Sequence, residues 1–231
     1  MTFAESVIAF NEQLKYTGKL PDGIRVMNPF KENKEALRVS SEFYRKFFSD
    51  NRSRKIILGI NPGRFGAGVT GIPFTDTKRL ESACGIEIND ITTHEPSSVF
   101  IYEMIDAYGG VKQFYSDIFI HAVCPLGFVK LNPGGKEINY NYYDSKELAE
   151  MATPFIVESV NKMMSFGIDR KTCFCLGNNQ NYKFLTTLNR QCKWFGTIEP
   201  LEHPRFIMQY RAKRKDEYVD KYVKTLRMAH G

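Results

Sequence analysis

The stretch that most constrains this chain is residues 56–76, where a short apolar run opens into a loop rich in glycine and proline. The run Ile56-Ile57-Leu58 has the β-branched, apolar composition of a buried strand. It ends at Gly59, and four more glycines and two prolines follow by residue 73. In α/β folds a ligand binds outside the carboxyl ends of the strands, and glycine lets the backbone come close to it. The stretch therefore predicts a ligand-binding loop at the end of a buried strand.

Two phosphate-binding interpretations of this loop fail on their context. Residues 66–71 match the dinucleotide-binding fingerprint, but they lie well past the strand, and Pro73 stands where a helix should begin. A Walker-type phosphate loop requires a closing Gly-Lys-Ser or Gly-Lys-Thr, which this loop does not contain. We therefore expect neither nucleotide-binding motif here.

Apolar runs and helical patterns alternate along the chain. We expect strands at residues 55–59, 118–123, 172–176 and 195–198, and helices at residues 3–16, 33–49, 99–108, 148–163, 182–188 and 218–226. Strands that alternate with helices indicate a parallel sheet covered on both faces. With no repeat and no low-complexity linker, the expected fold is a single domain over residues 1–231. Its class is α/β, a three-layer α/β/α sandwich with a central, mainly parallel four-stranded sheet.

The remaining segments are expected to be loops or short elements. Asp76 or Thr77 is suited to cap a short helix, and Pro154 is expected to kink its helix or to start its second part. Residues 26–30 are expected to be extended, and residues 89–98 and 130–144 to be loops.

Composition places the chain among globular proteins, with 42% apolar and 13% aromatic residues. No apolar run approaches the ~20 residues that span a bilayer, so no membrane association is expected. The N-terminus has no basic region followed by an apolar core, so we expect no secretory signal and a cytoplasmic location. The net charge of +6 is compatible with a polyanionic partner, but it is also common in proteins that bind no nucleic acid.

The five cysteines are expected to be reduced thiols, because their number is odd and no secretory signal is evident. Cys173 and Cys175 lie two apart in an expected strand, so they point to one face and suit core packing. The chain has no C-x₂-C pair, and we expect neither a metal site nor a cofactor.

The glycine-rich loop resembles the first active-site motif of the single-strand-selective monofunctional uracil-DNA glycosylases, whose pattern is close to G-M-N-P-G-P-F-G-M-x-x-T-G-V-P-F. The similarity covers the sixteen positions from Gly59 to Phe74 without a gap. The resemblance implies a uracil-DNA glycosylase-like fold, a water-positioning Asn61, and a Phe74 that stacks on the flipped base. It also implies contacts from backbone groups near Ile60 and Gly63 to the base or sugar. The alternatives are a turn-forming Asn61 and an ordinary core Phe74.

A second, shorter resemblance follows the last expected strand. The string Glu-His-Pro-Arg around His203 is similar to the family's His-Pro-Ser-Pro-Arg motif, although the second proline is missing. The resemblance implies that His203 stabilises the charge that builds on the uracil oxygen, whereas a lone histidine after a strand is usually structural. Arg205, Gln209 and Arg211 are candidates for contact with the DNA backbone, and the alternative is a solvated helix start.

The main departure from the family lies at Ala122. Residues 120–126 resemble the family's V-H-N-Y-C-P-L string, in which the asparagine reads the uracil edge, but this chain has alanine at that position. Ala122 offers only backbone groups, so we expect an amide from another segment to help, and Asn139 and Asn141 are the candidates. Their alternative is a plain polar loop. His121, in the same run, is expected to be a core residue.

Two functions of different classes remain open. The first is a monofunctional DNA repair glycosylase that flips uracil out of single- or double-stranded DNA and hydrolyses its N-glycosidic bond without a lysine Schiff base. The second is a non-catalytic nucleic-acid-binding protein with the same fold. This alternative remains because Ala122 and the shortened second motif depart from the pattern of the glycosylase family. In either case we expect a monomer.

Overall fold

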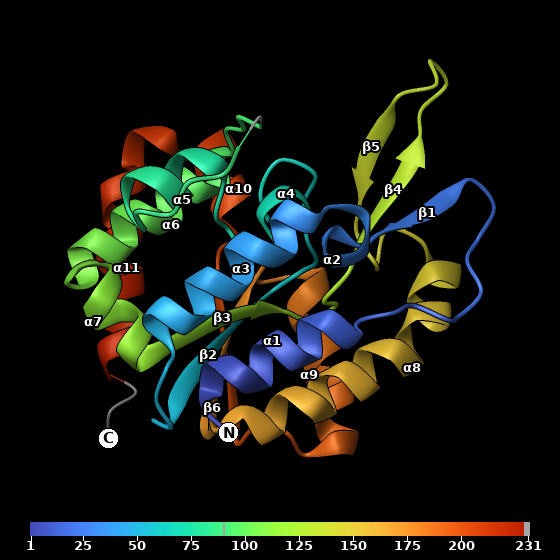
Figure 1. Cartoon of the computed structure of the whole chain (residues 1–231). Coiled ribbons are helices and arrows are strands. Elements are labelled where there is room, and N and C mark those ends of the chain that lie inside the picture. Colours follow the sequence, from blue (N-terminus) through green and yellow to red (C-terminus); the bar gives the residue numbers. More distant parts are fainter. Residues whose placement is uncertain (90, 229–231) are drawn as a thin grey trace.

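The computed structural model describes residues 1–89 and 91–228. Its centre is a parallel sheet of four strands in the order β3-β2-β6-β7 (Figure 1). The strands are β2 (Arg54–Gly59), β3 (Ile118–Ala122), β6 (Ile168–Leu176) and β7 (Thr197–Leu201). Every residue of β2 and β3 is buried, as expected for strands covered on both faces. The predicted four-stranded parallel sheet is therefore confirmed.

Helices lie on both sides of this sheet, which confirms the predicted three layers. In Figure 1, α6, α7, α10 and α11 lie on one side of the strands, and α1, α8 and α9 lie on the other. The helices are α1 (Phe3–Gln13), α2 (Pro29–Glu32), α3 (Lys34–Phe47), α4 (Ala67–Thr70), α5 (Thr77–Ser82), α6 (Pro96–Tyr108), α7 (Gly110–Asp117), α8 (Lys146–Met163), α9 (Gln180–Cys192), α10 (Pro204–Tyr210) and α11 (Lys215–Met228). Within the described ranges, none of them combines the length and hydropathy of a membrane span.

A second, smaller sheet is antiparallel and was not predicted. It contains β1 (Ile24–Met27), β4 (Gly127–Leu131) and β5 (Glu137–Tyr140) in the order β1-β4-β5. Strands β4 and β5 form a hairpin that projects from the body of the molecule (Figure 1). The prediction of a loop at residues 130–144 was therefore wrong for residues 130–131 and 137–140. Both strands of the hairpin are partly exposed and lack a regular apolar alternation, so periodicity gave no signal. The hairpin is held mainly by backbone hydrogen bonds between β4 and β5, which leave no pattern of buried side chains in the sequence.

Several boundaries also differ from those expected. Strand β6 begins at Ile168 instead of residue 172, and β7 begins at Thr197 instead of residue 195. Helix α7 was missed because Gly109 and Gly110 resembled a helix end, whereas the chain turns at Gly109, with φ of 126°, and resumes at once as a helix. Helix α8 runs unbroken through Pro154.

The segment after the glycine-rich loop is anchored by Asp76. As predicted, Asp76 caps a short helix, α5, and its Oδ1 accepts the N–H of Arg79 at 2.9 Å. Its Oδ2 accepts the N–H of Glu95 at 2.7 Å. The loop expected at residues 89–98 contains residue 90, which lies outside the described residues, and it gives way to α6 at Pro96. Asp76 therefore fixes Glu95 beside the glycine-rich loop.

The carboxyl ends of the parallel strands meet at one edge of the sheet. Gly59 at the end of β2 pairs with Ala122 at the end of β3, and Leu176 of β6 pairs with Leu201 of β7. The loops that follow these strands carry the predicted site residues, so the topology delivers them to this edge.

Candidate active site

A cavity of about 290 Å³ lies at the carboxyl edge of the parallel sheet. Its wall includes these residues that the sequence predicted for the site: Ile60, Asn61, Gly63, Phe74, Ala122, Asn139, Asn141, His203, Arg205 and Gln209. Arg211 does not line the cavity. Its guanidinium lies 5.5 Å from the ring centre of Phe206, and Phe206 does line the cavity. Tyr210 also borders the cavity, as do Glu95 and Tyr143, and the sequence did not point to the last two. Segments far apart in the chain thus form one pocket.

The side chain of Asn61 is held by the backbone of the chain around the end of β5. Its Oδ1 accepts the N–H of Tyr142 at 3.1 Å, and its Nδ2 lies 3.3 Å from the carbonyl oxygen of Tyr140. These partners are 81 and 79 residues away, so the amide joins two segments, although Nδ2 also lies 3.4 Å from the carbonyl oxygen of Pro62. An amide oxygen has two lone pairs, and one remains for a water molecule. The geometry thus favours a positioned polar group over a turn former.

A buried hydrogen-bond network supports the Asn61 contact. The hydroxyl of Tyr142 donates to Oδ1 of Asn181 at 2.6 Å. Nδ2 of Asn181 in turn lies 3.3 Å from the carbonyl oxygen of Gly59 and 2.9 Å from that of Leu176. Both side chains are almost completely buried, so these bonds satisfy groups that would otherwise be costly to bury. The network fastens the ends of β2 and β6 to the segment that holds Asn61, and nothing in the sequence pattern identified it.

Phe74 is held in a strained backbone conformation. Its φ is 53°, in the left-handed region that a non-glycine residue adopts at a cost of about 1–3 kcal/mol. The hydroxyl of Ser98 donates to the Phe74 carbonyl and helps to hold this conformation. The ring lies against Gly59, where an added Cβ would be only 3.0 Å from the ring. The ring centre is 5.7 Å from that of His203. The half-buried ring packs against the core and also borders the cavity, so it can serve as a platform there.

His203 is the N-cap of α10, and its hydrogen bond assigns its tautomer. Nδ1 accepts the N–H of Arg205 at 3.1 Å, so the ring proton is on Nε2. Burial and, to a smaller extent, the positive charge of Arg205 lower the pKa of His203 to about 4. The imidazole is therefore neutral near pH 7 and offers Nε2–H as a donor in the cavity.

Three residues were predicted to contact the edge of the base: Ala122, Asn139 and Asn141. Ala122 is buried at the end of β3 and borders the cavity, as does its neighbour His121. Oδ1 of Asn139 accepts the N–H of Arg64 at 3.0 Å. Nδ2 of Asn141 lies 3.2 Å from Oδ1 of Asp144, so this amide is already engaged. Of the two predicted amides, Asn139 is the better placed to contact a ligand.

His121 is enclosed by aromatic side chains. Its ring centre lies 5.7 Å from that of Phe10 and 5.6 Å from that of Phe119, and burial lowers its pKa to about 4. The side chain is 5% exposed, which suits the core role that the sequence predicted.

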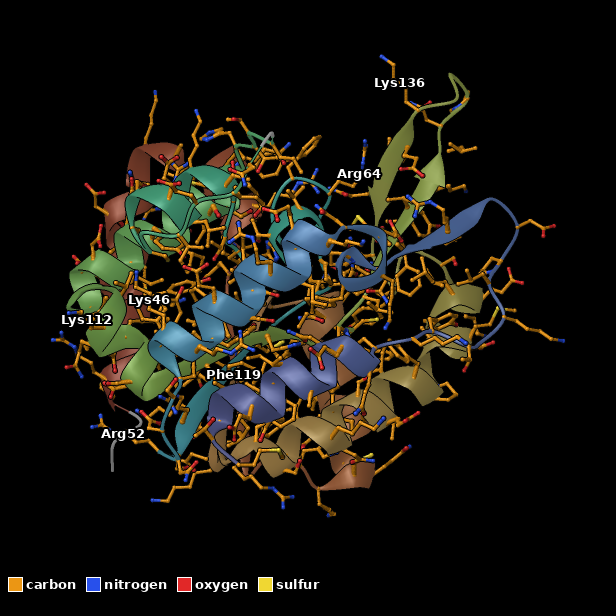
Figure 2. All side chains as sticks on the ribbon, in the orientation of Figure 1. Lys46, Arg52, Arg64, Lys112, Phe119 and Lys136 are labelled. Carbon is orange, nitrogen blue, oxygen red and sulfur yellow. The ribbon has the colours of Figure 1, made fainter. Side chains whose placement is uncertain are left out.

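Arg64 joins the glycine-rich loop to the β4–β5 hairpin. Besides the backbone contact with Asn139, its guanidinium donates to the carbonyl of Glu137. Figure 2 shows Arg64 beside the hairpin, with Lys136 at the hairpin's tip. The hairpin that the sequence missed therefore forms one wall of the site.

Helix α10 also contributes side chains to the wall of the cavity. Phe206 and Tyr210 are 40% and 60% exposed, and their rings lie 5.5 Å apart. Arg205 and Gln209 are exposed on the same helix and also border the cavity. Exposed aromatic and basic side chains beside a pocket suit an unstacked nucleic acid strand.

Glu95 is the titratable group of the pocket that sequence reasoning missed. It stands directly before Pro96, the first residue of α6, and a lone Glu-Pro in a polar segment carries no signal of its own. Burial, reinforced by the negative charge of Asp76, raises the pKa of Glu95 to about 7, against the opposing effect of Arg205. Within the described ranges, no His, Cys, Asp and Glu side chains cluster as the ligands of a metal ion would.

Comparisons with known proteins agree with the overall fold. The family model described as the uracil DNA glycosylase superfamily matches residues 45–227. The chain is 54% identical to SMUG2 of Pedobacter heparinus, and the match to its wild-type crystal structure covers 99% of this chain and 98% of that one. The TM-score of the two structures is 0.97. No curated protein shows a significant match to the chain.

Proposed function

Because the chain belongs to the uracil DNA glycosylase superfamily, we propose that it is a DNA glycosylase that flips uracil out of DNA and hydrolyses its N-glycosidic bond. The observation that carries this proposal is the meeting of Asn61, Phe74 and His203 in one cavity, although the first two follow β2 and His203 follows β7. Excision needs a water at the sugar, a platform for the base and a donor for the leaving oxygen. The three side chains match these needs one to one.

The proposed reaction separates charge across the cavity. The bond between the sugar carbon and the base nitrogen breaks, and its electron pair leaves with the base. Asn61 orients a water molecule, whose oxygen bonds to the sugar carbon while its proton passes to solvent. Nε2–H of His203 donates to the base oxygen where negative charge develops. Water attacks instead of a lysine amine, so the proposed enzyme is monofunctional.

We propose DNA that contains uracil as the partner, bound as a single strand or after local opening of a duplex. Arg205 and Gln209 on α10 would contact the backbone, with Arg211 just beyond the cavity. The residues that line the cavity run from Gly59 to Tyr210, so one domain supplies the whole proposed site, and we propose that it acts as a monomer.

An excision assay tests the proposed function. A labelled oligonucleotide with a single uracil is incubated with the protein, treated with alkali and separated on a gel, and the same sequence with thymine serves as control. We expect strand cleavage after alkali only for the uracil substrate. Retention of the oligonucleotide without cleavage would instead favour a non-catalytic nucleic-acid-binding protein, the alternative that Ala122 keeps open.

Phe74→Ala is expected to weaken capture of the flipped base. A stacking contact is worth ~1–3 kcal/mol, so excision at subsaturating enzyme should fall by about 5- to 150-fold. Single-turnover rates measured below and above saturation separate capture from chemistry. Phe74→Tyr keeps the ring and should retain most of the rate. Unchanged excision by folded Phe74→Ala would reassign this side chain to the core.

A further inference from the structure

At position 122, where the resemblance implies an asparagine that hydrogen-bonds the edge of the base, this chain has alanine. A glycosylase must separate uracil from cytosine, and the two bases differ at ring positions 3 and 4. Ala122 has neither a donor nor an acceptor in its side chain. A site distinguishes two such bases well when its polar groups form hydrogen bonds with the correct base and lose those partners when the incorrect base binds. The cavity must therefore supply these polar groups from elsewhere.

Two polar side chains face one open space beside Gly63. A Cβ added at Gly63 would lie 3.4 Å from Oε1 of Glu95 and 3.7 Å from Nδ2 of Asn139. All three residues border the cavity. An ionised carboxylate only accepts hydrogen bonds, and an amide nitrogen only donates them. The space next to Gly63 therefore has an acceptor and a donor side by side.

The orientation of the Asn139 amide is set by the glycine-rich loop. Its Oδ1 accepts the N–H of Arg64 at 3.0 Å, so the oxygen faces the loop and the nitrogen faces away from that contact. Among the described residues, Nδ2 has no hydrogen-bond partner. The donor is thus positioned but unused.

The carboxyl of Glu95 is also positioned but unused. Its backbone N–H is fixed by Asp76 at 2.7 Å, at the start of α6. A side chain at position 66 would collide with this carboxyl, so Gly66 leaves the space that it occupies. In the described part of the chain, neither carboxylate oxygen has a hydrogen-bond partner. Because this half-buried carboxyl borders the cavity, its oxygens are available to a ligand there.

We propose that Glu95 and Asn139 together read the edge of the flipped base, an inference that rests on the proposed function. Glu95 accepts the N3–H of uracil, and Nδ2 of Asn139 donates to O4. Cytosine presents the opposite pattern, an acceptor at N3 and an amino group at position 4, so both contacts would be lost. The pair thus takes the place of the missing side chain at Ala122.

The charges around Glu95 determine how this pair responds to pH. Asp76 favours the protonated carboxyl, Arg205 favours the ionised one, and Arg79 and His94 contact Asp76 at 3.0 and 3.8 Å. Protonation makes the carboxyl a weaker acceptor and adds an O–H donor, so the ionised form is the better acceptor for N3–H. It is present above the pKa of about 7 and is lost as the pH falls through that value. The kcat/KM for uracil, which reports the free enzyme, should therefore decrease as the pH falls below about 7.

The decisive experiment compares uracil with N3-methyluracil, which lacks the N3–H donor. With the parent protein, the methylated base should be excised about 10- to 100-fold more slowly, the worth of a hydrogen bond to a charged group. Glu95→Ala should lose a similar factor on uracil and show no further loss on the methylated base. Glu95→Gln keeps the shape and an acceptor, so it should fold, retain partial activity and lack the decrease in kcat/KM near pH 7.

Further variants test the donor and the space between the two side chains. Asn139→Asp replaces the donor by an acceptor and should lower kcat/KM for uracil by a similar factor. Gly63→Ala adds a methyl group at ordinary contact distances, so the protein should fold but exclude the base edge. The control is Glu150→Gln, an exposed glutamate on α8 that contacts Lys146, and it should leave every rate unchanged.

The outcomes separate this inference from the proposed function. If the parent protein excises no uracil at all, the proposed function itself is wrong. If the parent excises uracil while Glu95→Ala and Asn139→Asp keep both its rate and its preference over N3-methyluracil, only the edge-reading pair is wrong. If the Glu95 variants excise uracil and N3-methyluracil more slowly by the same factor and keep the parental pH profile, Glu95 has a structural role, and the inference is also wrong.

Discussion

Asn61→Ala is expected to abolish most excision while DNA retention stays largely intact. The amide orients the attacking water, so its loss affects the chemical step more than ground-state binding. Misplacing a reacting group by about 1 Å can cost ~10²-fold in rate, and we expect a decrease of at least about this size. The measurement is the single-turnover rate at saturating protein, together with retention of the uracil oligonucleotide on a native gel.

The control for this variant is Asn178→Ala. Asn178 is exposed at the end of β6 and does not border the cavity, so its removal should change neither rate nor retention. Because Asn61 also bonds the backbone around the end of β5, a thermal melt should verify that the variant is folded. A folded Asn61→Ala that keeps a near-parental rate would make Asn61 a turn residue and would remove the proposed mechanism.

His203→Ala is expected to slow the chemical step strongly. A donor aimed at developing negative charge is typically worth ~2.7–4 kcal/mol, or about 10²- to 10³-fold in rate. With a pKa of about 4, His203 is neutral from about pH 5 upward, so the loss should be constant across that range. A change confined to KM would count against this role.

Capping must be separated from catalysis in this variant. His203 is the N-cap of α10, so alanine removes both the Nε2–H donor and the acceptor for the N–H of Arg205. Asparagine is a good N-cap residue but does not reproduce the ring's Nε2–H. His203→Asn should therefore melt close to the parent and yet remain slow. If it regains the parental rate, the role of His203 is to cap the helix.

The parallel sheet could be predicted because its signal is local. Runs such as Ile56 to Leu58 are apolar enough to be buried on both faces, and the glycines that follow end the strand visibly. Asn61, Phe74 and His203 could be named because the loops that follow two such strands, β2 and β7, carry strings that resemble a known family's motifs. Their approach in space then follows from parallel pairing, which brings carboxyl ends together.

The parts that the sequence did not predict depend on long-range contacts. The β4–β5 hairpin has few buried side chains, and its residue Tyr140 matters to the site through a backbone carbonyl that is invisible in sequence. Glu95 looks like any polar loop residue until Gly66 and Asp76 are seen beside it. Asn181 likewise gains its meaning only from the buried hydroxyl of Tyr142. In each case the partner is distant in the chain, so no periodic pattern marks it.

The site contains residues from both sheets, so the free energy of opening the site can differ from the free energy of unfolding the whole protein. Asn61 follows the large parallel sheet, but the groups that orient its amide, and Asn139 as well, lie in β5 or directly after it. Proteins open locally in cooperative units whose free energies lie below that of global unfolding. If the small sheet is such a unit, its detachment would release the amide while the core persists. Catalytic competence should then disappear at lower denaturant concentrations than folded structure, and β5 amides should exchange with solvent sooner than those of β2.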